Sequence, residues 1–274
     1  GNQSDLKTID YLRHFGEDPE IRVIGIYAEQ IKEGTEFFNL AKKVTREKPI
    51  LGWKSGKSRA GARAVRSHTG SLAGSDAAYE AAFKQAGIIR VDNLDQLTDY
   101  AVAFATPYLP AGNRIALIME AGGGAVSASD ACESAGLVVP QLSEKLQKTL
   151  DEYLSPFLPP ASGRSNPIDL VWPPQDKYPD ILAHCFNTMN SVVDMFIIAT
   201  YYPLNEEKLM TRVVELQDKV KKPIFMVAGH HTVNQEGIRA YTVSGIPAFT
   251  TPVRAGRAAA ALCRYGAYRR KSRR

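Results

Sequence analysis

Apolar residues along the first hundred positions recur with two spacings, one helical and one typical of strands. Residues 5–15 carry apolar side chains three or four positions apart, which predicts a helix capped by Ser4 or Asp5. Residues 22–27 form a short apolar run that predicts a strand. Further helices are predicted at residues 35–44, 76–86 and 94–105, and further strands at residues 48–54 and 87–91. This alternation favours a parallel sheet that is covered by helices on both faces.

The periodicity stops at residues 106–113, where Pro107, Pro110 and Gly112 favour a linker. A second alternating set follows the linker. Its strands are predicted at residues 114–119, 138–140, 195–199, 223–227 and 246–249, and a proline-rich loop at residues 157–165 leads to residues 166–170. Its helices are predicted at residues 124–135, 143–153, 177–189, 205–220 and 233–243, with a last helix from residue 252. We therefore expect an α/β fold of two flavodoxin-like, doubly wound parallel-sheet domains, residues 1–108 and residues 109–274.

The composition is that of a globular protein and argues against several other classes. Of the 274 residues, 44% are hydrophobic and 23% are charged, which are ordinary values. No apolar run is long enough to cross a bilayer. The three cysteines have no metal-ligand spacing and suit a reducing cytoplasm. The net charge of +5 suits phosphorylated ligands, whereas the basic C-terminal cluster, interpreted as a frayed helix end, lacks the aromatic platforms of a nucleic-acid site.

Residues 67–76 are rich in glycine and hydroxyl groups and surround one imidazole, that of His68. We expect this stretch to be a loop, because it lies between a predicted strand and a predicted helix. Glycine lets a backbone turn tightly and direct N–H groups at an anion, and Ser75 or Asp76 can cap the helix that follows. Histidine can act as a covalent nucleophile, so His68 is either the carrier of a phosphoryl group or an exposed loop residue without chemistry.

A family resemblance favours the first of these two interpretations. Residues 59–66, Arg-Ala-Gly-Ala-Arg-Ala-Val-Arg, and residues 67–76, Ser-His-Thr-Gly-Ser-Leu-Ala-Gly-Ser-Asp, resemble the phosphohistidine segment of the NDP-forming acyl-CoA synthetases. That family includes ADP-forming acetyl-CoA synthetases and is related to succinyl-CoA synthetase. The resemblance continues through residues 79–91 and covers essentially the whole chain, weakening after Pro203.

The resemblance implies an activity and a mechanism. A ligase of this kind converts acyl-CoA, phosphate and ADP into a carboxylic acid, CoA and ATP. An acyl phosphate forms first and phosphorylates His68, and a mobile loop then carries the phosphoryl group to ADP. The alternative function is a non-catalytic module derived from this family, a CoA-related sensor or scaffold, but the presence of both His68 and Glu29 argues against it.

Glu29 follows the predicted strand at residues 22–27, at the edge where open α/β sheets bind ligands. A carboxylate bonded to one imidazole nitrogen orients the ring and leaves the other nitrogen free to attack. The resemblance implies this role for Glu29 beside His68, although Gln30 stands where the family usually has glycine. A solvated loop glutamate is the alternative interpretation.

Three consecutive glycines follow the predicted strand at residues 114–119 and open the next helix. Free N–H groups at a helix start can bind an anion, although tight strand–helix turns use glycine as well. The resemblance implies a phosphate site here, to which the His68 loop also contributes. The phosphate-binding residues are expected to be Gly122, Gly123, Gly124, Ala125, Thr69 and Gly70. Glu120 departs from the threonine or asparagine that is common in the family at its position.

Two further motifs are interpreted as weaker signals. Residues 52–58 have three residues between their glycines where the Walker A motif needs four, and a long loop is predicted after them. We therefore reject a nucleotide site there and interpret Lys54 and Lys57 as solvated lysines, with assistance to phosphate binding as the alternative. Residues 166–169 resemble the Asn-Pro-x-Asp segment of the family, and they form either a turn or part of the phosphate-transfer surface.

The other histidines and the two tryptophans give no functional signal. No Cys, Asp or Glu cluster surrounds His230 and His231, so no metal site is expected. Trp53 and Trp172 are interpreted as packing residues rather than as platforms for bases.

The resemblance also implies what the complete enzyme needs. In the family, a CoA-binding Rossmann domain and the first strand and helix of the phosphohistidine domain precede this region. The chain is therefore expected to be a fragment or one piece of a nicked protein. CoA, ADP or ATP, and Mg would be substrates of the complete enzyme, whose ATP-grasp domain or subunit lies elsewhere. Phosphate on His68 is the expected covalent group. We expect a cytoplasmic oligomer without nucleic-acid or membrane partners.

Overall fold

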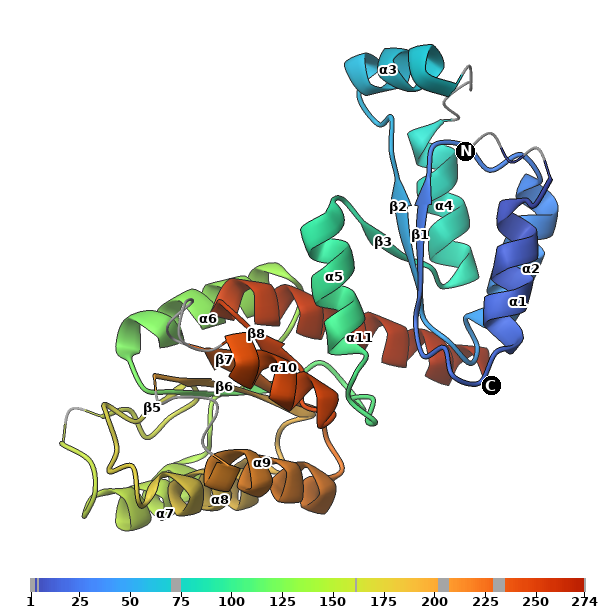
Figure 1. Ribbon diagram of the computed structural model, residues 1–274. Coiled ribbons are helices and arrows are strands. Elements are labelled where there is room, and N and C mark those ends of the chain that lie inside the picture. Colours follow the sequence, from blue (N-terminus) through green and yellow to red (C-terminus); the bar gives the residue numbers. More distant parts are fainter. Residues whose placement is uncertain are drawn as a thin grey trace. The chain divides into compact units, whose positions relative to one another are not determined.

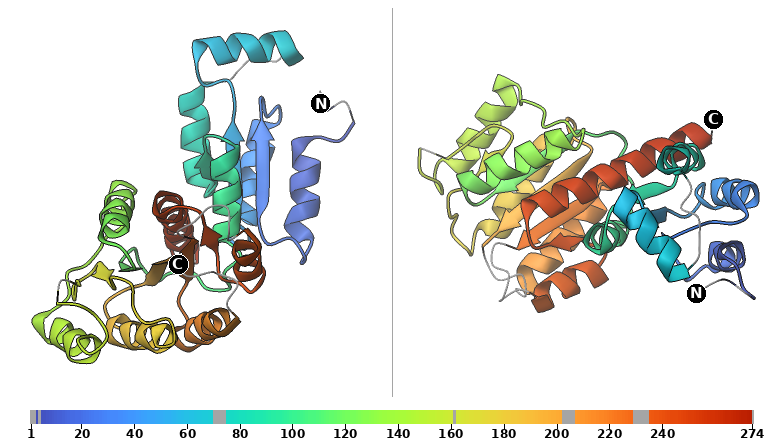
Figure 2. Two further views of the ribbon diagram at one scale, coloured as in Figure 1. Left: turned by 60° about the vertical axis from the view of Figure 1, so that its left-hand side comes forward. Right: turned by 90° about the horizontal axis from the view of Figure 1, so that it is seen from above.

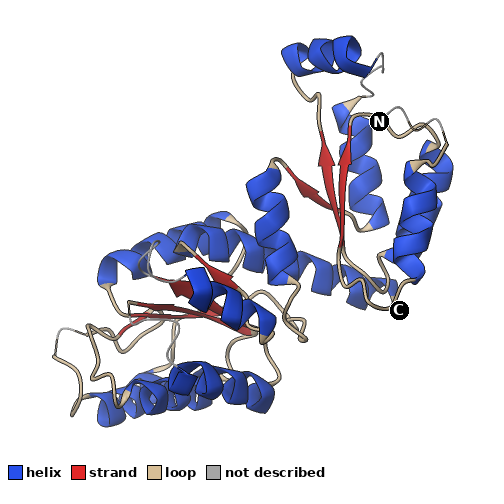
Figure 3. Ribbon diagram, viewed as in Figure 1, coloured by secondary structure: helices blue, strands red, loops and turns tan. Residues whose placement is uncertain are grey.

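The computed structural model describes residues 3, 5–69, 75–160, 162–201, 207–228 and 235–273. It divides the chain into two units: unit 1 is Gly1–Phe104 with Ala267–Arg274, and unit 2 is Ala105–Gly266. Each unit has its own parallel sheet (Figures 1 and 3). Within the described residues, three strands in unit 1 have the order β1-β2-β3, and five in unit 2 have the order β5-β4-β6-β7-β8. The predicted α/β fold class with two parallel sheets is confirmed.

The bounds of the elements follow the predicted alternation of strands and helices. Unit 1 contains α1 (Thr8–Glu17), β1 (Ile24–Ala28), α2 (Gly34–Val44), β2 (Ile50–Lys54), α3 (Arg59–Thr69), α4 (Asp76–Ala86), β3 (Ile89–Val91) and α5 (Leu94–Ala103). Unit 2 contains β4 (Ile115–Met119), α6 (Gly122–Ser134), α7 (Glu144–Leu154), β5 (Ile168–Asp169), α8 (Tyr178–Met189), β6 (Met195–Thr200), α9 (Glu207–Val220), β7 (Ile224–Ala228), α10 (Gln235–Val243) and β8 (Ala248–Phe249). A last helix, α11 (Pro252–Ser272), begins in unit 2, and its residues from Ala267 belong to unit 1. No helix among the described residues is long and apolar enough to cross a membrane.

Helices cover both faces of the sheet in unit 1 (Figure 2). Helices α1, α2 and α4 lie side by side on one face, and α5 packs on the other. A glycine in β2 brings α4 close, because a methyl group at Gly52 would lie 2.5 Å from a ring carbon of Phe83. On the opposite face, a methyl group at Gly25 would lie 3.5 Å from the side chain of Leu97 in α5.

The central strands of unit 2 are buried along their whole length, as is usual for parallel sheets. Every residue of β4, β6 and β7 is buried. Helices α7, α8 and α9 contribute to the core on one face, and α6 packs against α11, since a methyl group at Gly256 would lie 3.2 Å from the sulfur of Cys132.

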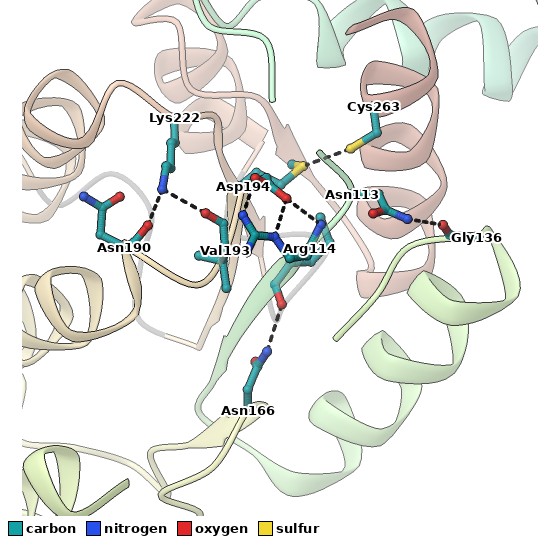
Figure 4. A network of polar contacts seen from close by, with 11 residues as sticks. Asn113, Arg114, Gly136, Asn166, Asn190, Val193, Asp194, Lys222 and Cys263 are labelled. Atoms are coloured by element: carbon teal, nitrogen blue, oxygen red, sulfur yellow. Dashed lines mark hydrogen bonds and ion pairs between the residues drawn. The ribbon is translucent and has the colours of Figure 1, made fainter. Parts of the chain in front are cut away.

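A charged network fixes the ends of β4 and β6 where these strands begin (Figure 4). The Arg114 side chain donates two hydrogen bonds, of 2.9 and 3.0 Å, to the Asp194 carboxylate. The buried position of Asp194 raises the pKa of its carboxyl, but the hydrogen bonds from Arg114 more than offset this and hold that pKa below 3.8. Asn166 accepts from Leu117 N (2.9 Å) and donates to Ile115 O (2.9 Å), so it ties the approach to β5 to β4.

The last turn of α11 is an integral part of unit 1. Thr45 donates a hydrogen bond of 3.1 Å to the Tyr268 hydroxyl, and Arg269 forms a 3.1 Å ion pair with Glu47. The ring of Tyr268 lies directly over Gly87, the C-cap of α4, which has a φ of 74°. The interpretation of the basic C-terminal cluster as a frayed end is therefore wrong, because the helix is held by the half-buried ring of Tyr268 and by ion pairs.

Three local predictions are also wrong. Residues 59–69 form α3 instead of a loop, because alanine and arginine are strong helix formers; Val65 is the one large apolar residue of the segment, so large apolar side chains at helical spacing were lacking. The predicted strand at residues 138–140 is a single bridge between Arg114 and Val138. The N-cap of α1 is Lys7, whose N–H donates to Asp10 at 2.8 Å.

The seat of Tyr268 gives a first testable prediction. A Gly87→Ala substitution adds a methyl group 2.3 Å from the ring at a positive φ, so overpacking adds about 1–3 kcal/mol to a backbone cost of about 1–2 kcal/mol. The matched control is Gly136→Ala, which has a φ of 85° with no described atom within 4 Å of the added methyl. Urea unfolding measured by Trp53 fluorescence for unit 1 and Trp172 fluorescence for unit 2 separates the two costs.

Equal destabilisation by the two substitutions would contradict the assigned packing of Tyr268. A chain that already carries Tyr268→Ala provides a second check. In that chain, Gly87→Ala should lower the free energy of unfolding only by the cost of placing alanine at a positive φ.

Candidate functional site

Glu29 lies where the sequence placed it, directly after β1 at the carboxyl edge of the unit 1 sheet, the edge at which the strands end. It is half-buried. The register pairs Ala28 with Lys54 at the ends of β1 and β2, and Ser55 N donates to Ala28 O at 3.1 Å. Glu29 and Lys54 therefore leave the sheet side by side, from neighbouring strands.

The structure describes His68 through its backbone, which lies in the last turn of α3. Ser67, His68 and Thr69 are helical, which corrects the prediction that the loop begins at residue 67. The side chains of His68 and Thr69 lie outside the described part of the structure, as does Gly70. Their predicted roles stay predictions.

The helix that follows this segment is fixed at its first turn. Arg90 on β3 forms ion pairs with Asp76 and with Glu80, the latter at 2.7 Å. Ser75 occupies the N-cap of α4, but its side chain makes no capping hydrogen bond. The start of α4 is thus held by charges from the sheet rather than by a cap.

Lys54 is the residue of this edge that the sequence interpretation missed. It is 1% exposed and is among the largest fully buried side chains, so the expectation of a solvated lysine is wrong. Its ammonium lies 4.9 Å from the centre of the Tyr79 ring on α4. Burial lowers the pKa of Lys54, an effect opposed by the charges of Asp76 and Glu29 and reinforced by Arg90. The alternation of side chains along β2 carried the signal, because positions 52 and 54 face the same side, toward α4.

Unit 2 has a pocket at its own carboxyl edge. The chain leaves β4 for β5 on one side, whereas β6 pairs with β4 on the other, so these strand ends form a switch point where open α/β sheets bind ligands. The pocket has a volume of about 220 Å³. Its polar lining comes from strand ends and helix starts, with side chains of Glu120, Ser127, Thr200, Thr250 and Thr251.

The three glycines stand at the start of α6, and Gly124 lines this pocket. Helix α6 begins at Gly122, two residues before the predicted start. A methyl group at Gly122 would lie 3.0 Å from Asp169 Oδ2, whereas at Gly123 and Gly124 no described atom lies within 4 Å. The backbone N–H groups of this turn are therefore approachable by an anion from outside.

Glu120 forms the polar floor of the pocket. It is 1% exposed and accepts hydrogen bonds of 2.7 Å from Thr200 Oγ1 and of 2.7 Å from Tyr201 N. Burial raises the pKa of its carboxyl above 4.5, against the lowering effect of these two donors. Glu120 thus joins the end of β4 to the end of β6. The shorter side chain of a threonine at this position would not reach both Thr200 Oγ1 and Tyr201 N.

The remaining sequence motifs fall into structural and surface roles. Asn166 is buried and bonded to β4, which favours the turn interpretation of residues 166–169. Trp172 is 61% exposed and stacks on Tyr201 with ring centres 5.1 Å apart, so it is not a core packing residue as expected. His230 and His231 lie outside the described residues. Within the described part of the chain, no group of three or more His, Cys, Asp or Glu side chains could hold a metal ion.

The buried Glu120 predicts a pH dependence of stability. Its pKa in the folded state is raised, so between pH 4.5 and that raised value the folded chain holds a proton that the unfolded chain has lost. The free energy of unfolding of unit 2 should therefore fall as pH rises from about 4.5, and Glu120→Gln should remove this slope. Urea unfolding monitored by Trp172 fluorescence between pH 4 and 8 tests this, with the exposed Glu133→Gln as control.

A slope that is the same in the wild-type chain and in Glu120→Gln would contradict the assignment.

Known proteins resemble this chain in sequence and in structure. A family model described as "Succinyl-CoA ligase like flavodoxin domain" matches residues 1–104. The alpha subunit of ADP-forming acetate–CoA ligase II from Pyrococcus furiosus is 44% identical over 171 residues, which are 62% of this chain and 36% of that protein. The alpha subunit of isoform I from the same organism is 34% identical over 99% of this chain and 58% of its own length.

A solved structure agrees over nearly the whole chain. Acetyl-coenzyme A synthetase 1 of Ca. Korarchaeum cryptofilum, solved in complex with phosphate and ADP, superposes with a TM-score of 0.82 at 30% identity, covering 99% of this chain and 60% of that chain. The present chain thus spans between a third and two thirds of the length of these relatives. By sequence and by fold, the chain belongs to the NDP-forming acyl-CoA synthetases, the family related to succinyl-CoA synthetase.

Proposed function

We propose that this chain is the phosphoryl-handling part of an ADP-forming acyl-CoA synthetase. The complete enzyme converts acyl-CoA, phosphate and ADP into a carboxylic acid, CoA and ATP. The observation that carries the proposal is the arrangement at the carboxyl edge of unit 2, where a helix start with three glycines opens onto a polar pocket. The family to which the chain belongs supports the same activity.

The proposed reaction has three steps. Phosphate bound at Gly122, Gly123, Gly124 and Ala125 attacks the acyl carbon of the thioester, so the C–S bond breaks and acyl phosphate and CoA result. A ring nitrogen of His68 then attacks phosphorus, the bond from phosphorus to the acyl oxygen breaks, and the carboxylate leaves. A terminal oxygen of ADP finally takes the phosphoryl group from the nitrogen, which restores His68 and forms ATP.

Glu29 would orient the imidazole in this scheme. A carboxylate that accepts the N–H of one ring nitrogen fixes the tautomer and leaves the other nitrogen as the nucleophile. It also stabilises the positive ring that forms when phosphorus is attached. The place of Glu29 at the end of β1 supports this role, because strand ends hold side chains in a fixed direction. Thr69 and Gly70 are proposed to add hydrogen-bond donors near the phosphoryl group.

Other components complete the proposed enzyme. We propose that residues 1–108 act as the phosphohistidine-carrying domain and residues 109–274 as the second ligase domain. A CoA-binding Rossmann domain and an ATP-grasp domain or subunit would supply the CoA and the ADP–Mg sites, within an oligomer. A cytoplasmic location is proposed because the three cysteines are free and buried, as suits a reducing compartment.

His68 provides the direct test of the proposed function. In the completed enzyme, acyl-CoA and phosphate should attach an acid-labile, base-stable phosphoryl group to His68, and His68→Ala should abolish ATP formation. Glu29→Gln keeps the size of the side chain but removes its charge, so phosphorylation should slow by roughly 10²–10⁴. Radiolabelled phosphate with peptide mapping measures both effects. Label on a different residue, or normal ATP formation by His68→Ala, would refute the mechanism.

The glycine turn of α6 gives a separate test. Gly123→Val places its side chain where no described atom lies within 4 Å, so the fold should persist while the bulk blocks the approach of phosphate. We expect a rise of at least tenfold in the KM for phosphate, with an unchanged melting temperature. Val126→Ala, an exposed position one turn further into α6, is the control. Normal phosphate kinetics in Gly123→Val would leave only a tight turn.

A further inference from the structure

Lys54 is a fully buried cation at the edge of the unit 1 sheet where the proposed function places its chemistry. Burial of an ammonium is costly unless it is paired and hydrogen-bonded, and lysine is almost never fully buried without a partner. The exposed fraction of Lys54 is 1%. A methionine would fill the same space without that cost, so the charge needs an explanation from its contacts.

The contacts of Lys54 link the ends of two strands and the first turn of a helix. Its ammonium donates to the backbone oxygen of Ser55 and lies 4.9 Å from the centre of the Tyr79 ring, a cation–π contact. The charges of Asp76 and Glu29 act favourably on the ammonium, and that of Arg90 acts against it. Lys54 is therefore an electrostatic neighbour both of the strand end that carries Glu29 and of the helix that starts after the His68 segment.

Tyr79 links Lys54 to the loop after β1. Its hydroxyl accepts a hydrogen bond of 2.9 Å from Ile31 N, two residues beyond Glu29. Its ring also makes an edge-to-face contact with Phe83, with ring centres 5.8 Å apart. The Tyr79 side chain thus contacts Lys54 and Phe83 with its ring and the backbone at Ile31 with its hydroxyl.

The hydrogen bond between Tyr79 and Ile31 N lies beside a cavity. An apolar cavity of about 370 Å³ lies between α2 and α4, and Gln30, Ile31, Ser75 and Tyr79 are among the residues that line it. Close packing therefore does not by itself set the distance between the loop after β1 and the start of α4. The hydrogen bond between Tyr79 and Ile31 spans this region and does so from a ring that rests on Lys54.

We propose that Lys54 is a positioning residue, a buried cation that holds Tyr79 and through it fixes the Glu29 loop against the first turn of α4. The inference rests on the proposed function, because its consequence is the orientation of His68 by Glu29. Lys54 does not touch the phosphoryl group in this scheme. It acts through Tyr79, whose hydroxyl accepts the hydrogen bond from Ile31 N.

Three variants of the complete enzyme test the inference. Lys54→Met keeps the length and removes the charge, Lys54→Arg keeps a charge, and Tyr79→Phe keeps the ring but removes the acceptor for Ile31 N. We expect Lys54→Met to slow phosphorylation of His68 by about 10²-fold, the effect of a misplacement of roughly 1 Å. Lys54→Arg should phosphorylate His68 faster than Lys54→Met does. Tyr79→Phe should also slow phosphorylation, and because it leaves Lys54 unchanged, the slowing would not come from a change in the buried charge.

The control is a lysine of the same strand region with purely structural contacts. Lys48 precedes β2 at its other end and donates to the backbone oxygens of Phe15, at 3.1 Å, and Asp18. Lys48→Met should lower stability but leave the phosphorylation rate unchanged. Equal slowing by Lys48→Met and Lys54→Met would overturn the inference, because it would mean that any loss of stability has this effect.

A double-mutant cycle separates positioning from general damage. If Lys54 acts through Glu29, then Lys54→Met should add little to the loss already caused by Glu29→Gln, whereas independent effects would multiply. Hydrogen exchange of the amides of residues 29–31 gives a readout without turnover, and it should accelerate in Lys54→Met and in Tyr79→Phe. Multiplying rate losses or unchanged exchange would overturn the inference. Absence of phosphate on His68 in the unsubstituted enzyme would instead overturn the proposed function, and the exchange data would still decide the role of Lys54.

Discussion

Parallel strand pairing is the constraint on which the rest of this structure depends. All strands of a parallel sheet end at the same edge, so each chain segment that follows a strand begins there. In unit 1, β1 and β2 bring Glu29 and Lys54 to adjacent positions in this way. In unit 2, β4, β6 and β8 bring Glu120, Thr200 and Thr250 to one pocket. Residues far apart in the sequence become neighbours because the hydrogen bonds between parallel strands fix which strand ends lie next to each other.

The opposite edge and the buried faces of the sheets supply the rigidity that such sites need. The ion pair of Arg114 with Asp194 and the amide of Asn166 hold the beginnings of the unit 2 strands (Figure 4). Close approach of the helices depends on small residues, such as Gly52 under Phe83 and Gly256 beside Cys132. A site built at the end of such strands changes little when one surface loop moves, since the strand ends are fixed by the core behind them.

Buried charges mark both candidate edges. Lys54 in unit 1 and Glu120 in unit 2 are each 1% exposed, and each joins a strand end to a neighbouring element through named contacts. Burying an ionisable group has a large desolvation cost, so we do not explain either side chain as a contribution to the stability of the core. Both side chains lie at the carboxyl edge of a parallel sheet, the edge where open α/β sheets bind ligands.

The sequence alone determined the alternation of strands and helices, because the apolar period is a local property that backbone geometry imposes. It also determined where Glu29 and the glycines at Gly122 to Gly124 lie, since both directly follow apolar runs that could be read as strands. The helical backbone of His68 was missed because α3 has one large apolar residue, Val65, among its alanines and arginines. The contact of Lys54 with Tyr79 and the seat of Tyr268 on Gly87 could only come from the tertiary structure. The packing of these side chains is decided by neighbours that are distant in the sequence, since Tyr79 lies 25 positions from Lys54 and Tyr268 lies 181 positions from Gly87.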